Sequence, residues 1–565
     1  MYNKVFIDRL NKLHTMWDES ECMIGEMKSN VGSGYHSIIT GRVHGTNITA
    51  EYASGIFYAG QKEYYKRAVA AFERLGQLQD SDPESKTYGL WPYFKEEDLH
   101  AMKAPDYNFS DFIGKHFIYV LKMHSDELEP DEREMMKTIL CRAMRCSIKR
   151  NVSPDYSNIS MMSSMTIISA AELLEDEAML ENGKARLRKA YEYNMFSGAF
   201  SEYNSSTYTI LLLAELTRMK LFFKDEECCK MAQELEGLAW ENLSLYYNTK
   251  IGQLSPPEKR SYRDLDDGQL SAFIYLATDG KYGSPDGEDK LVMSFLTLPF
   301  KCPDRFLKNF DINNKFIDKA YYKKNNIRSA DEDTVIIRSL DSPELHAYTF
   351  MTDKYSMGAF DKSDLWNQRR TCSVVWSDGN GSKSFRLRGI NGDYDYCSAL
   401  SSVTMTDNSI GGLLGYATDH GDFHYILDKD KSGAIKTNYL GFKFCLSGNT
   451  DDVKITRDKN VFTISDSTVT IRLNIIKWIF DGKEGKIACG EKEIELIGYQ
   501  GAEKEIDIKK LKESYAVFTM TVNGDEVEYT AEKDGDAVRL TRRDNGKSAV
   551  INAKPCPFDE FMNLK

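Results

Sequence analysis

The sequence predicts an all-helical first half, built as an incomplete α/α toroid, followed by an antiparallel β-sandwich. Up to about residue 300 apolar residues recur at helical spacing, whereas after about residue 330 β-branched and aromatic residues alternate with polar ones. Helical and strand-like segments do not interleave, which favours two consecutive domains over a parallel βαβ fold. We expect the toroid over residues 1–320 and the sandwich over residues 321–565.

The individual elements follow from local patterns. In the first half, turn-rich connections such as QDSDPESKTYG separate segments with a helical apolar period, and the lack of a fixed repeat argues for a toroid over a regular solenoid. In the second half, runs such as TCSVVWSD and SYAVFTMTVNG alternate as antiparallel strands do. The predicted helices span residues 50–79, 111–124, 131–149, 160–175, 183–195, 207–223, 225–246 and 268–277.

Composition limits the classes of function. The 565 residues carry a formal net charge of -13, which argues against a nucleic-acid binder and requires any anionic ligand to be held by a local cluster of cationic or amide groups. Aromatic residues make up 12%, enough to line a sugar-binding cleft or to fill a large core. No signal peptide or membrane span is visible, and the 11 Cys are scattered. We therefore expect a cytoplasmic protein without a membrane partner; the sequence predicts no particular oligomeric state.

Four polar clusters lie in the connections between predicted helices, where a toroid exposes its cavity. They are residues 42–46, 156–158, 201–208 and 259–263. Taken singly, each has an ordinary structural explanation, such as a helix N-cap or a solvated turn. Together they bring His, Asn, Tyr and Arg side chains to successive helix ends, which indicates a cleft for a sugar acid.

The run GAFSEYNSSTY at residues 198–208 resembles the GxFxEYNSPTY signature of the heparinase II/III-like family of α/α-toroid polysaccharide lyases. Further segments resemble motifs of that family, in its order, over about residues 40–370. They are YGLWP at 88–92, DYNFSDF at 106–112, YSNI at 156–159 and DLWNQRR at 364–370. The resemblance implies cleavage of uronate-containing, glycosaminoglycan-like chains by β-elimination, with an anionic oligo- or polysaccharide as substrate and no required cofactor.

β-Elimination needs a group that neutralises the uronate carboxylate, a base for the C5 proton and an acid for the departing oxygen. The resemblance assigns Asn158 as the neutraliser and Tyr208, 50 positions later, as the acid and a candidate base. His44 is a candidate separate base, since imidazole titrates near neutral pH, and Tyr262 is a candidate assistant. The candidate substrate-binding residues are Trp91, Asn108, Glu202, Tyr203, Asn204, Arg260, Trp366, Gln368 and Arg369.

The chain departs from the family pattern at three places. Ser206 replaces the Pro of the signature, the turn SPPEKR lacks the family's His, and DLWNQRR has no His where several related lyases carry their base. These departures keep two other classes of function open. One is a glycoside hydrolase on the same toroid, which needs two carboxylic acids, with Asp106, Glu202 and Asp264 as candidates. The other is a carbohydrate-binding protein without catalysis.

A short acidic and His-containing segment is a candidate metal site. His420 and His424 lie close to Asp419 and Asp422, and imidazole is a ligand for a structural divalent metal such as zinc. In a strand the two His side chains would share one face about 13 Å apart, at ~3.3 Å per residue, so each would need a distant partner. The alternative is a polar loop between strands.

Overall fold

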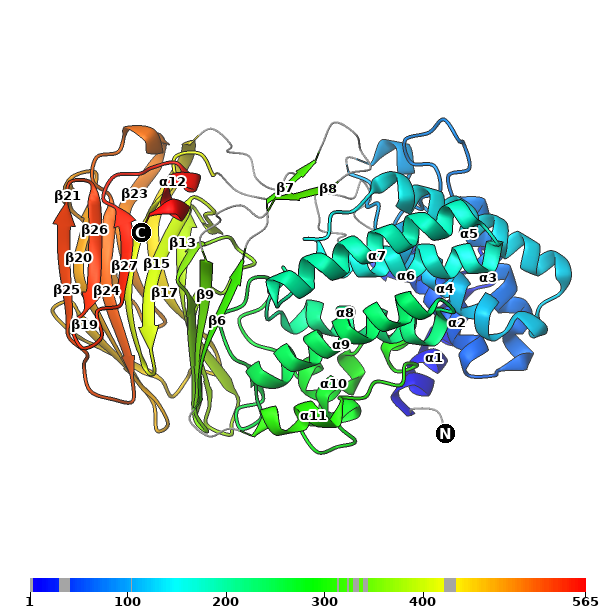
Figure 1. The fold of residues 1–565 in the computed structure, drawn as a ribbon, viewed down its shortest axis with the longest axis horizontal. Coiled ribbons are helices and arrows are strands. Elements are labelled where there is room, and N and C mark those ends of the chain that lie inside the picture. The colour runs from blue at the N-terminus through cyan, green and yellow to red at the C-terminus, as the bar shows by residue number, and fades with distance from the viewer. Residues whose placement is uncertain are drawn as a thin grey trace. The chain divides into compact units, whose positions relative to one another are not determined.

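A computed structural model describes residues 4–29, 41–102, 104–311, 315–322, 325–328, 335–338, 344–420 and 433–564. Helices dominate the first half of the chain and antiparallel strands the second, which confirms the predicted fold class (Figure 1). The chain divides into two compact units, and the predicted boundary near residue 320 stays a prediction. We call them the helical unit, Met1–Phe196, Ile210–Ala239 and Asp286–Lys301, and the β unit, Ser197–Thr209, Trp240–Pro285 and Cys302–Lys565.

The described helices are α1 (Lys4–Met16), α2 (Thr46–Tyr58), α3 (Tyr65–Leu78), α4 (Phe109–Met123), α5 (Pro130–Arg150), α6 (Ser157–Leu174), α7 (Glu177–Ser197), α8 (Ser206–Phe222), α9 (Glu226–Tyr246), α10 (Gln269–Ala277), α11 (Asp304–Leu307) and α12 (Phe558–Asn563). The predicted helix over 50–79 is in fact two helices, because the chain turns at Gly60, whose φ of 63° suits glycine. Within the described ranges no helix combines the length and apolarity that a bilayer span requires.

The helices of the helical unit pack in two layers. α2 contacts α4, and α4 contacts α6, whereas α3 and α5 contact each other and cover α2 and α4. α6 is buried continuously from Ser157 to Ala171, while α3 buries only the face that carries Phe72 and Leu75. Small Ser and Ala side chains allow α6 to be packed on every side, and a single apolar stripe suits an outer helix. This layering packs helix on helix, as the predicted α/α toroid requires.

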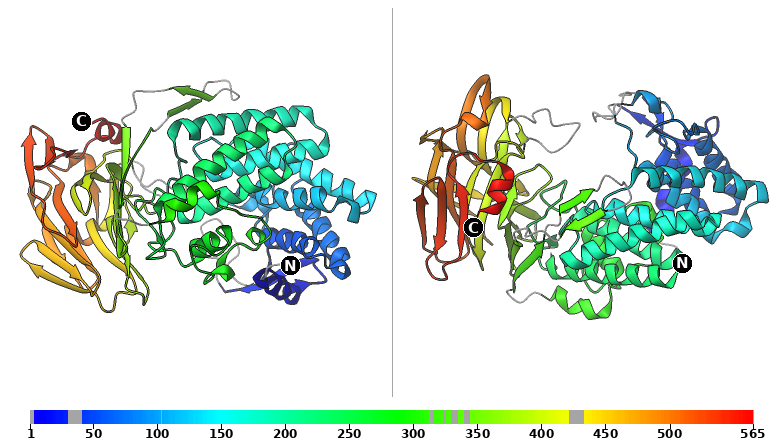
Figure 2. Two further views of the ribbon diagram at one scale, coloured as in Figure 1. Left: turned by 60° about the horizontal axis from the view of Figure 1, so that its bottom comes forward. Right: turned by 45° about the horizontal axis from the view of Figure 1, so that its top comes forward.

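Two large antiparallel sheets form the body of the β unit (Figures 1 and 2). In spatial order the first contains β22 (Lys486–Cys489), β23 (Glu493–Asp507), β17 (Ala434–Gly448), β13 (Ser382–Asn391), β12 (Cys372–Ser377), β10 (Tyr355–Phe360), β9 (Glu344–Met351) and β6 (Lys315–Tyr322). The second contains β11 (Lys362–Asp364), β15 (Ala399–Thr406), β16 (Ser409–Tyr416), β24 (Tyr515–Val522), β20 (Thr470–Phe480), β19 (Val461–Ser465) and β18 (Lys454–Asp458).

Short strands complete the described elements. In the helical unit they form the sheet β1 (Trp17–Asp18), β2 (Met23–Lys28) and β3 (Gly41–His44). In the β unit they are β4 (Tyr247–Asn248), β5 (Gln253–Leu254), β7 (Asn325–Arg328), β8 (Val335–Arg338), β14 (Tyr394–Asp395), β21 (Lys483–Glu484), β25 (Tyr529–Asp534), β26 (Ala537–Arg542) and β27 (Ser548–Asn552).

The two large sheets enclose a shared apolar core. Trp376, Phe385 and Phe444 of the first sheet and Trp478 and Phe518 of the second belong to one cluster, and each is at most 2% exposed. Burial of an apolar side chain of this size stabilises the fold by about 2–3 kcal/mol. Alternating strand residues thus build the predicted β-sandwich from both inner faces.

Candidate active site

Three segments of the β unit that are distant in sequence meet at one place. They are residues 197–209, the turn 255–263, and residues 365–371. Backbone hydrogen bonds join them: the Lys259 N–H donates to the Tyr203 carbonyl (3.0 Å), and the Ser261 N–H donates to the Gln368 carbonyl (2.6 Å). The family-like signature, the SPPEKR turn and the DLWNQRR motif are therefore parts of a single site.

The turn lies closely against β10. A Cβ at Gly358 would lie 2.0 Å from the carbonyl oxygen of Pro256, so only glycine permits this approach. On the other side, the side-chain amide of Asn204 donates to the carbonyls of Ser255 (2.6 Å) and Pro257 (2.9 Å). Asn204, predicted to bind substrate, thus uses its amide to hold the turn, and its φ of 51° is one that Asn tolerates.

A pair of tyrosines lies at the centre of this site. Tyr208 is in the first turn of α8, where its N–H donates to the capping Ser205 hydroxyl (3.1 Å). The hydroxyls of Tyr208 and Tyr262 are hydrogen-bonded to each other, and their ring centroids are 5.8 Å apart. Tyr208 is only 8% exposed, whereas Tyr262 is 55% exposed. The pair therefore connects a buried hydroxyl with the surface, as a proton relay requires.

Arg260 stacks on the ring of Tyr208. Its guanidinium carbon is 4.4 Å from the ring centroid. Nη1 forms an ion pair with Glu202 Oε1 (2.5 Å), and Nε donates to Gln368 Oε1 (3.1 Å). Glu202 and Gln368, both predicted to bind substrate, therefore orient Arg260.

The environment of Tyr208 favours its protonated form. Burial raises the pKa of Tyr208 far above its ordinary value of 10.0, Arg260 opposes this rise, and Tyr262 and Glu202 add to it. At neutral pH the buried hydroxyl keeps its proton and can donate it to a leaving group.

Glu258 lies at the junction of the three segments, and sequence analysis missed it. Its N–H donates to the Arg370 carbonyl (3.1 Å) and its carbonyl accepts from the Arg370 N–H (2.8 Å). Burial raises the pKa of its carboxyl to about 7, against the opposing influence of the Arg370 guanidinium, the Ser261 hydroxyl and the Ser206 N–H. Within the described part of the chain, Glu258 Oε2 has no hydrogen-bond partner. In the sequence, the SPPEKR turn differs from the family pattern because it lacks the His, and this difference could have drawn attention to Glu258.

Other predicted residues of the β unit make internal contacts. Arg369 Nη1 lies 2.5 Å from Asp364 Oδ2, and its guanidinium is 5.9 Å from the centroid of the Trp366 ring. Tyr203 is 2% exposed and packs edge-on against Tyr246, with centroids 5.7 Å apart. Both side chains support the site from within the protein.

His44 and Asn158 belong to the helical unit. His44 Nδ1 lies 2.6 Å from Glu96 Oε1, and Nε2 lies 3.3 Å from Asp18 Oδ2. Both ring nitrogens of His44 therefore face carboxylates of the helical unit, and its role as the base stays a prediction. Asn158, the second residue of α6, is 2% exposed.

Trp91 and Asn108 are also residues of the helical unit. Trp91 is 1% exposed and its Nε1–H donates to the Leu75 carbonyl (2.7 Å), so its indole packs the core and offers no face to a sugar ring. Asn108 Oδ1 accepts a hydrogen bond from Arg150. These two predicted substrate-binding residues have structural roles in this conformation.

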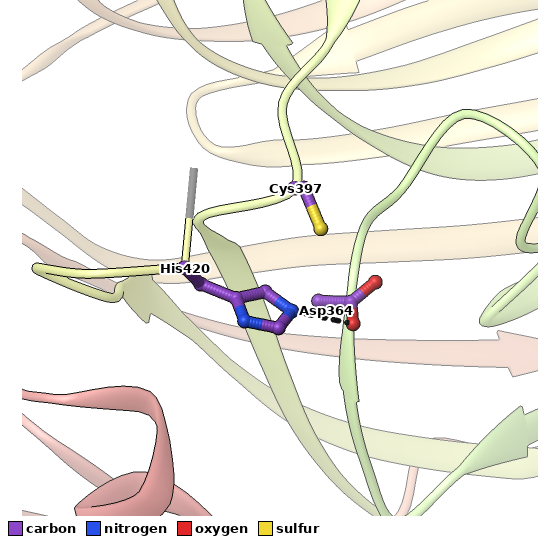
Figure 3. Close-up of side chains that lie close together, drawn as sticks. All are labelled: Asp364, Cys397 and His420. Carbon is purple, nitrogen blue, oxygen red and sulfur yellow. Dashed lines mark hydrogen bonds and ion pairs between the residues drawn. The ribbon is translucent and has the colours of Figure 1, made fainter. Parts of the chain in front are cut away.

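Asp364, Cys397 and His420 form a cluster whose candidate metal-ligating atoms all lie within 4.8 Å of one another (Figure 3). His424 lies outside the described residues. The spacing of Asp364 and Cys397 in the sequence did not indicate that they are candidate metal ligands. A carboxylate, a thiol and an imidazole are zinc-type donors. However, Asp364 Oδ2 is also 3.1 Å from His420 Nε2 and 2.5 Å from Arg369 Nη1, so a cation already neutralises it. A structural metal stays a prediction, which elemental analysis of the purified protein would test.

Known proteins similar to this chain were identified at the level of sequence families and of solved structures. Residues 4–279 match the model of a domain of unknown function, DUF8769. No curated protein matches the chain. A crystal structure of heparinase III aligns at 10% identity and a TM-score of 0.43, covering 89% of this chain and 84% of that one.

Two further solved structures give lower scores. Heparinase III with methylated lysines aligns at 11% identity and a TM-score of 0.35, covering 89% of this chain and 82% of that one. A GH127 β-L-arabinofuranosidase from Geobacillus stearothermophilus aligns at 9% identity and a TM-score of 0.26, covering 82% of this chain and 90% of that one. At these identities an activity has to be argued from the residues of the site.

Proposed function

We propose that the chain is a carbohydrate-active enzyme, and specifically a lyase that cleaves uronate-containing oligo- or polysaccharides by β-elimination. The observation that supports this proposal most is the hydrogen-bonded pair of Tyr208 and Tyr262 beneath the stacked guanidinium of Arg260. Tyr208 lies in the segment that resembles the lyase signature, and its hydroxyl is protonated at neutral pH.

The tyrosine pair can complete a proton cycle. Tyr262 takes the C5 proton while its own hydroxyl proton passes to Tyr208 through their shared hydrogen bond; the C5–H electrons form the C4=C5 bond, and the C4–O bond breaks. Tyr208 gives its proton to the departing oxygen, so both hydroxyls are restored. The guanidinium over the ring of Tyr208 stabilises the negative charge that develops on the pair during the transfer.

Neutralisation of the uronate carboxylate is proposed for Asn158, on the resemblance of YSNI to the family motif. Arg260 and Arg369 are less suited to this task, because each forms a 2.5 Å ion pair with a carboxylate of the protein.

The product of the reaction tests the proposal. The protein is incubated with hyaluronan, chondroitin, heparan, alginate and pectic oligosaccharides, and both ultraviolet absorbance and new reducing ends are measured. A lyase produces one conjugated C4=C5 bond per new reducing end. Reducing ends without absorbance would establish a hydrolase instead, and binding without either signal would establish a non-catalytic carbohydrate-binding protein.

One observation favours the hydrolase alternative. The Glu258 carboxyl, with a pKa of about 7, has the character of a general acid. Hydrolysis also needs a second carboxylate near the scissile bond. The predicted candidate Glu202 is already paired with Arg260, so the tyrosine pair supports a lyase more strongly.

Replacement of Arg260 tests its role over the tyrosine ring. We expect Arg260→Lys to lower kcat about 10-fold. The planar guanidinium of Arg260 stacks on Tyr208 while it binds Glu202 and Gln368, and the ammonium of lysine cannot make these three contacts at once. The initial rate of absorbance increase measures this. Arg263→Lys is the matched control, since Arg263 is 62% exposed and pairs with Asp267. Equal rates for wild type and Arg260→Lys would contradict the assignment.

A further inference from the structure

We propose that Glu258 is a positioning residue that holds Tyr262 against Tyr208, a role that rests on the proposed lyase chemistry. Glu258 is four positions before Tyr262 on the same turn. The next residue, Lys259, donates its N–H to the Tyr203 carbonyl (3.0 Å), and the N–H of Ser206, the first residue of α8 and two positions before Tyr208, lowers the pKa of the Glu258 carboxyl. It therefore links the two backbone segments whose side chains share the hydroxyl–hydroxyl hydrogen bond.

Arg370 anchors Glu258 to the β-sandwich. Arg370 pairs with Glu258 through two backbone hydrogen bonds, and its guanidinium partly offsets the rise in the pKa of the Glu258 carboxyl. Arg370 Nε lies 2.8 Å from Asp264 Oδ1, which is itself 2.8 Å from Arg386 Nε, while Asp264 Oδ2 accepts from the Ser447 hydroxyl (2.8 Å). This network reaches β13 and β17, so Glu258 connects the sheet to the turn that carries Tyr262.

Ionisation of the buried Glu258 carboxyl lowers the stability of the folded protein. Its pKa rises from 4.5 to about 7 on folding, so the folded protein loses stability as the pH increases from about 4.5 to 7, where the unfolded chain has already released the proton. Oε2 is buried and has no hydrogen-bond partner among the described residues. A buried acid that weakens the fold yet joins the active segments fits a functional role better than a structural one.

Ionisation of Glu258 should act on the tyrosine pair. The groups that face its carboxyl are the Arg370 guanidinium, the Ser206 N–H, the Ser261 hydroxyl and the carboxyl of Asp266, and of these Asp266 alone opposes ionisation. Above about pH 7 the carboxylate attracts Arg370 and the Ser206 N–H more strongly and tightens the turn against α8. Below that pH the protonated carboxyl holds the turn less firmly, and the distance between the tyrosine hydroxyls is less well controlled.

The kinetic test compares wild type with Glu258→Gln, which keeps the shape and removes the charge. In the wild type we expect kcat to rise through a transition near pH 7. In Glu258→Gln we expect that transition to vanish and kcat at pH 8 to fall about 10-fold, with KM changed less than about two-fold, as for a misplaced catalytic group. Asp361→Asn is the matched control, because burial also raises the pKa of Asp361, to about 6, and it accepts from the Lys362 N–H (2.7 Å) outside the site.

A second measurement needs no substrate and separates this inference from the proposed function. Tyrosine labelled with ¹³C at Cζ is incorporated, and the Tyr262 resonance is assigned with Tyr262→Phe. We expect this resonance to shift with a midpoint near pH 7 in wild type and in Asp361→Asn, but not in Glu258→Gln. A resonance that is unaffected by Glu258→Gln, or a wild-type pH–kcat profile retained by that variant, would overturn the role of Glu258. A normal resonance shift without unsaturated product would instead reject only the lyase chemistry.

Discussion

Tyr208→Phe should lower the kcat for formation of unsaturated product by about 10³-fold, within the range expected for loss of a general acid. The substitution removes one oxygen atom, the one that is hydrogen-bonded to Tyr262 and that burial keeps protonated. The ring, its contact with Arg260 at 4.4 Å and the Ser205 cap of α8 remain in place. KM should change little, because the lost interaction acts on the departing oxygen in the transition state.

The matched control is Tyr355→Phe. Tyr355 is also buried, at 4% exposure, and its hydroxyl donates to the Val522 carbonyl (3.3 Å) within the sandwich. It should keep wild-type activity and lose only the modest stability of one hydrogen bond, about 1 kcal/mol. If Tyr208→Phe retained wild-type kcat on a substrate that the wild type cleaves, Tyr208 would not be the acid.

The largest expected effect on stability is that of Lys383→Met in the β unit. The Lys383 side chain is completely buried, and its Nζ lies 2.9 Å from Asp378 Oδ2, 2.7 Å from Asp452 Oδ1 and 2.9 Å from Asp466 Oδ2. Asp466 is also fully buried and accepts a hydrogen bond from the Trp376 indole (2.7 Å). Removal of the ammonium leaves a buried carboxylate without its cation, which costs about 3–5 kcal/mol.

Urea unfolding followed by tryptophan fluorescence measures this effect. Lys383→Met should unfold at markedly lower urea than wild type, whereas Lys443→Met, which removes a lysine that is 19% exposed and paired with Glu493 and Glu495, should change the midpoint less. Equal midpoints for Lys383→Met and wild type would contradict a structural role for the cluster.

The same cluster has a predictable pH dependence. Although burial acts to raise it, hydrogen bonding from Lys383 and Trp376 lowers the pKa of Asp466 below its ordinary value of 3.8. A carboxylate with a depressed folded-state pKa stabilises the protein above its unfolded-state value and loses that contribution as the pH falls below it. The difference in stability between wild type and Lys383→Met should therefore shrink as the pH is lowered from 5 towards 2.

Local sequence patterns predicted most of the fold but fewer of the contacts within the candidate site. The helical period predicted α4 through α10, because a helix that buries one stripe or its whole length shows this in its apolar spacing. The division of residues 50–79 at Gly60 was missed, since the apolar period continues across the turn. Tyr208 and Arg260 were found because each lies in a motif that resembles a known family.

The sequence by itself determined the order of a helical region and a β-sandwich, and the residue types that an acid, a relay and a cation require. Tertiary structure decided which of them act together. It placed Arg260 on Tyr208, committed Asn204, Arg369 and His44 to internal partners, and brought Glu258 to the junction of the three segments. The physical reason is that burial and contacts between distant segments set hydrogen-bond partners and pKa values, and neither is encoded in local spacing.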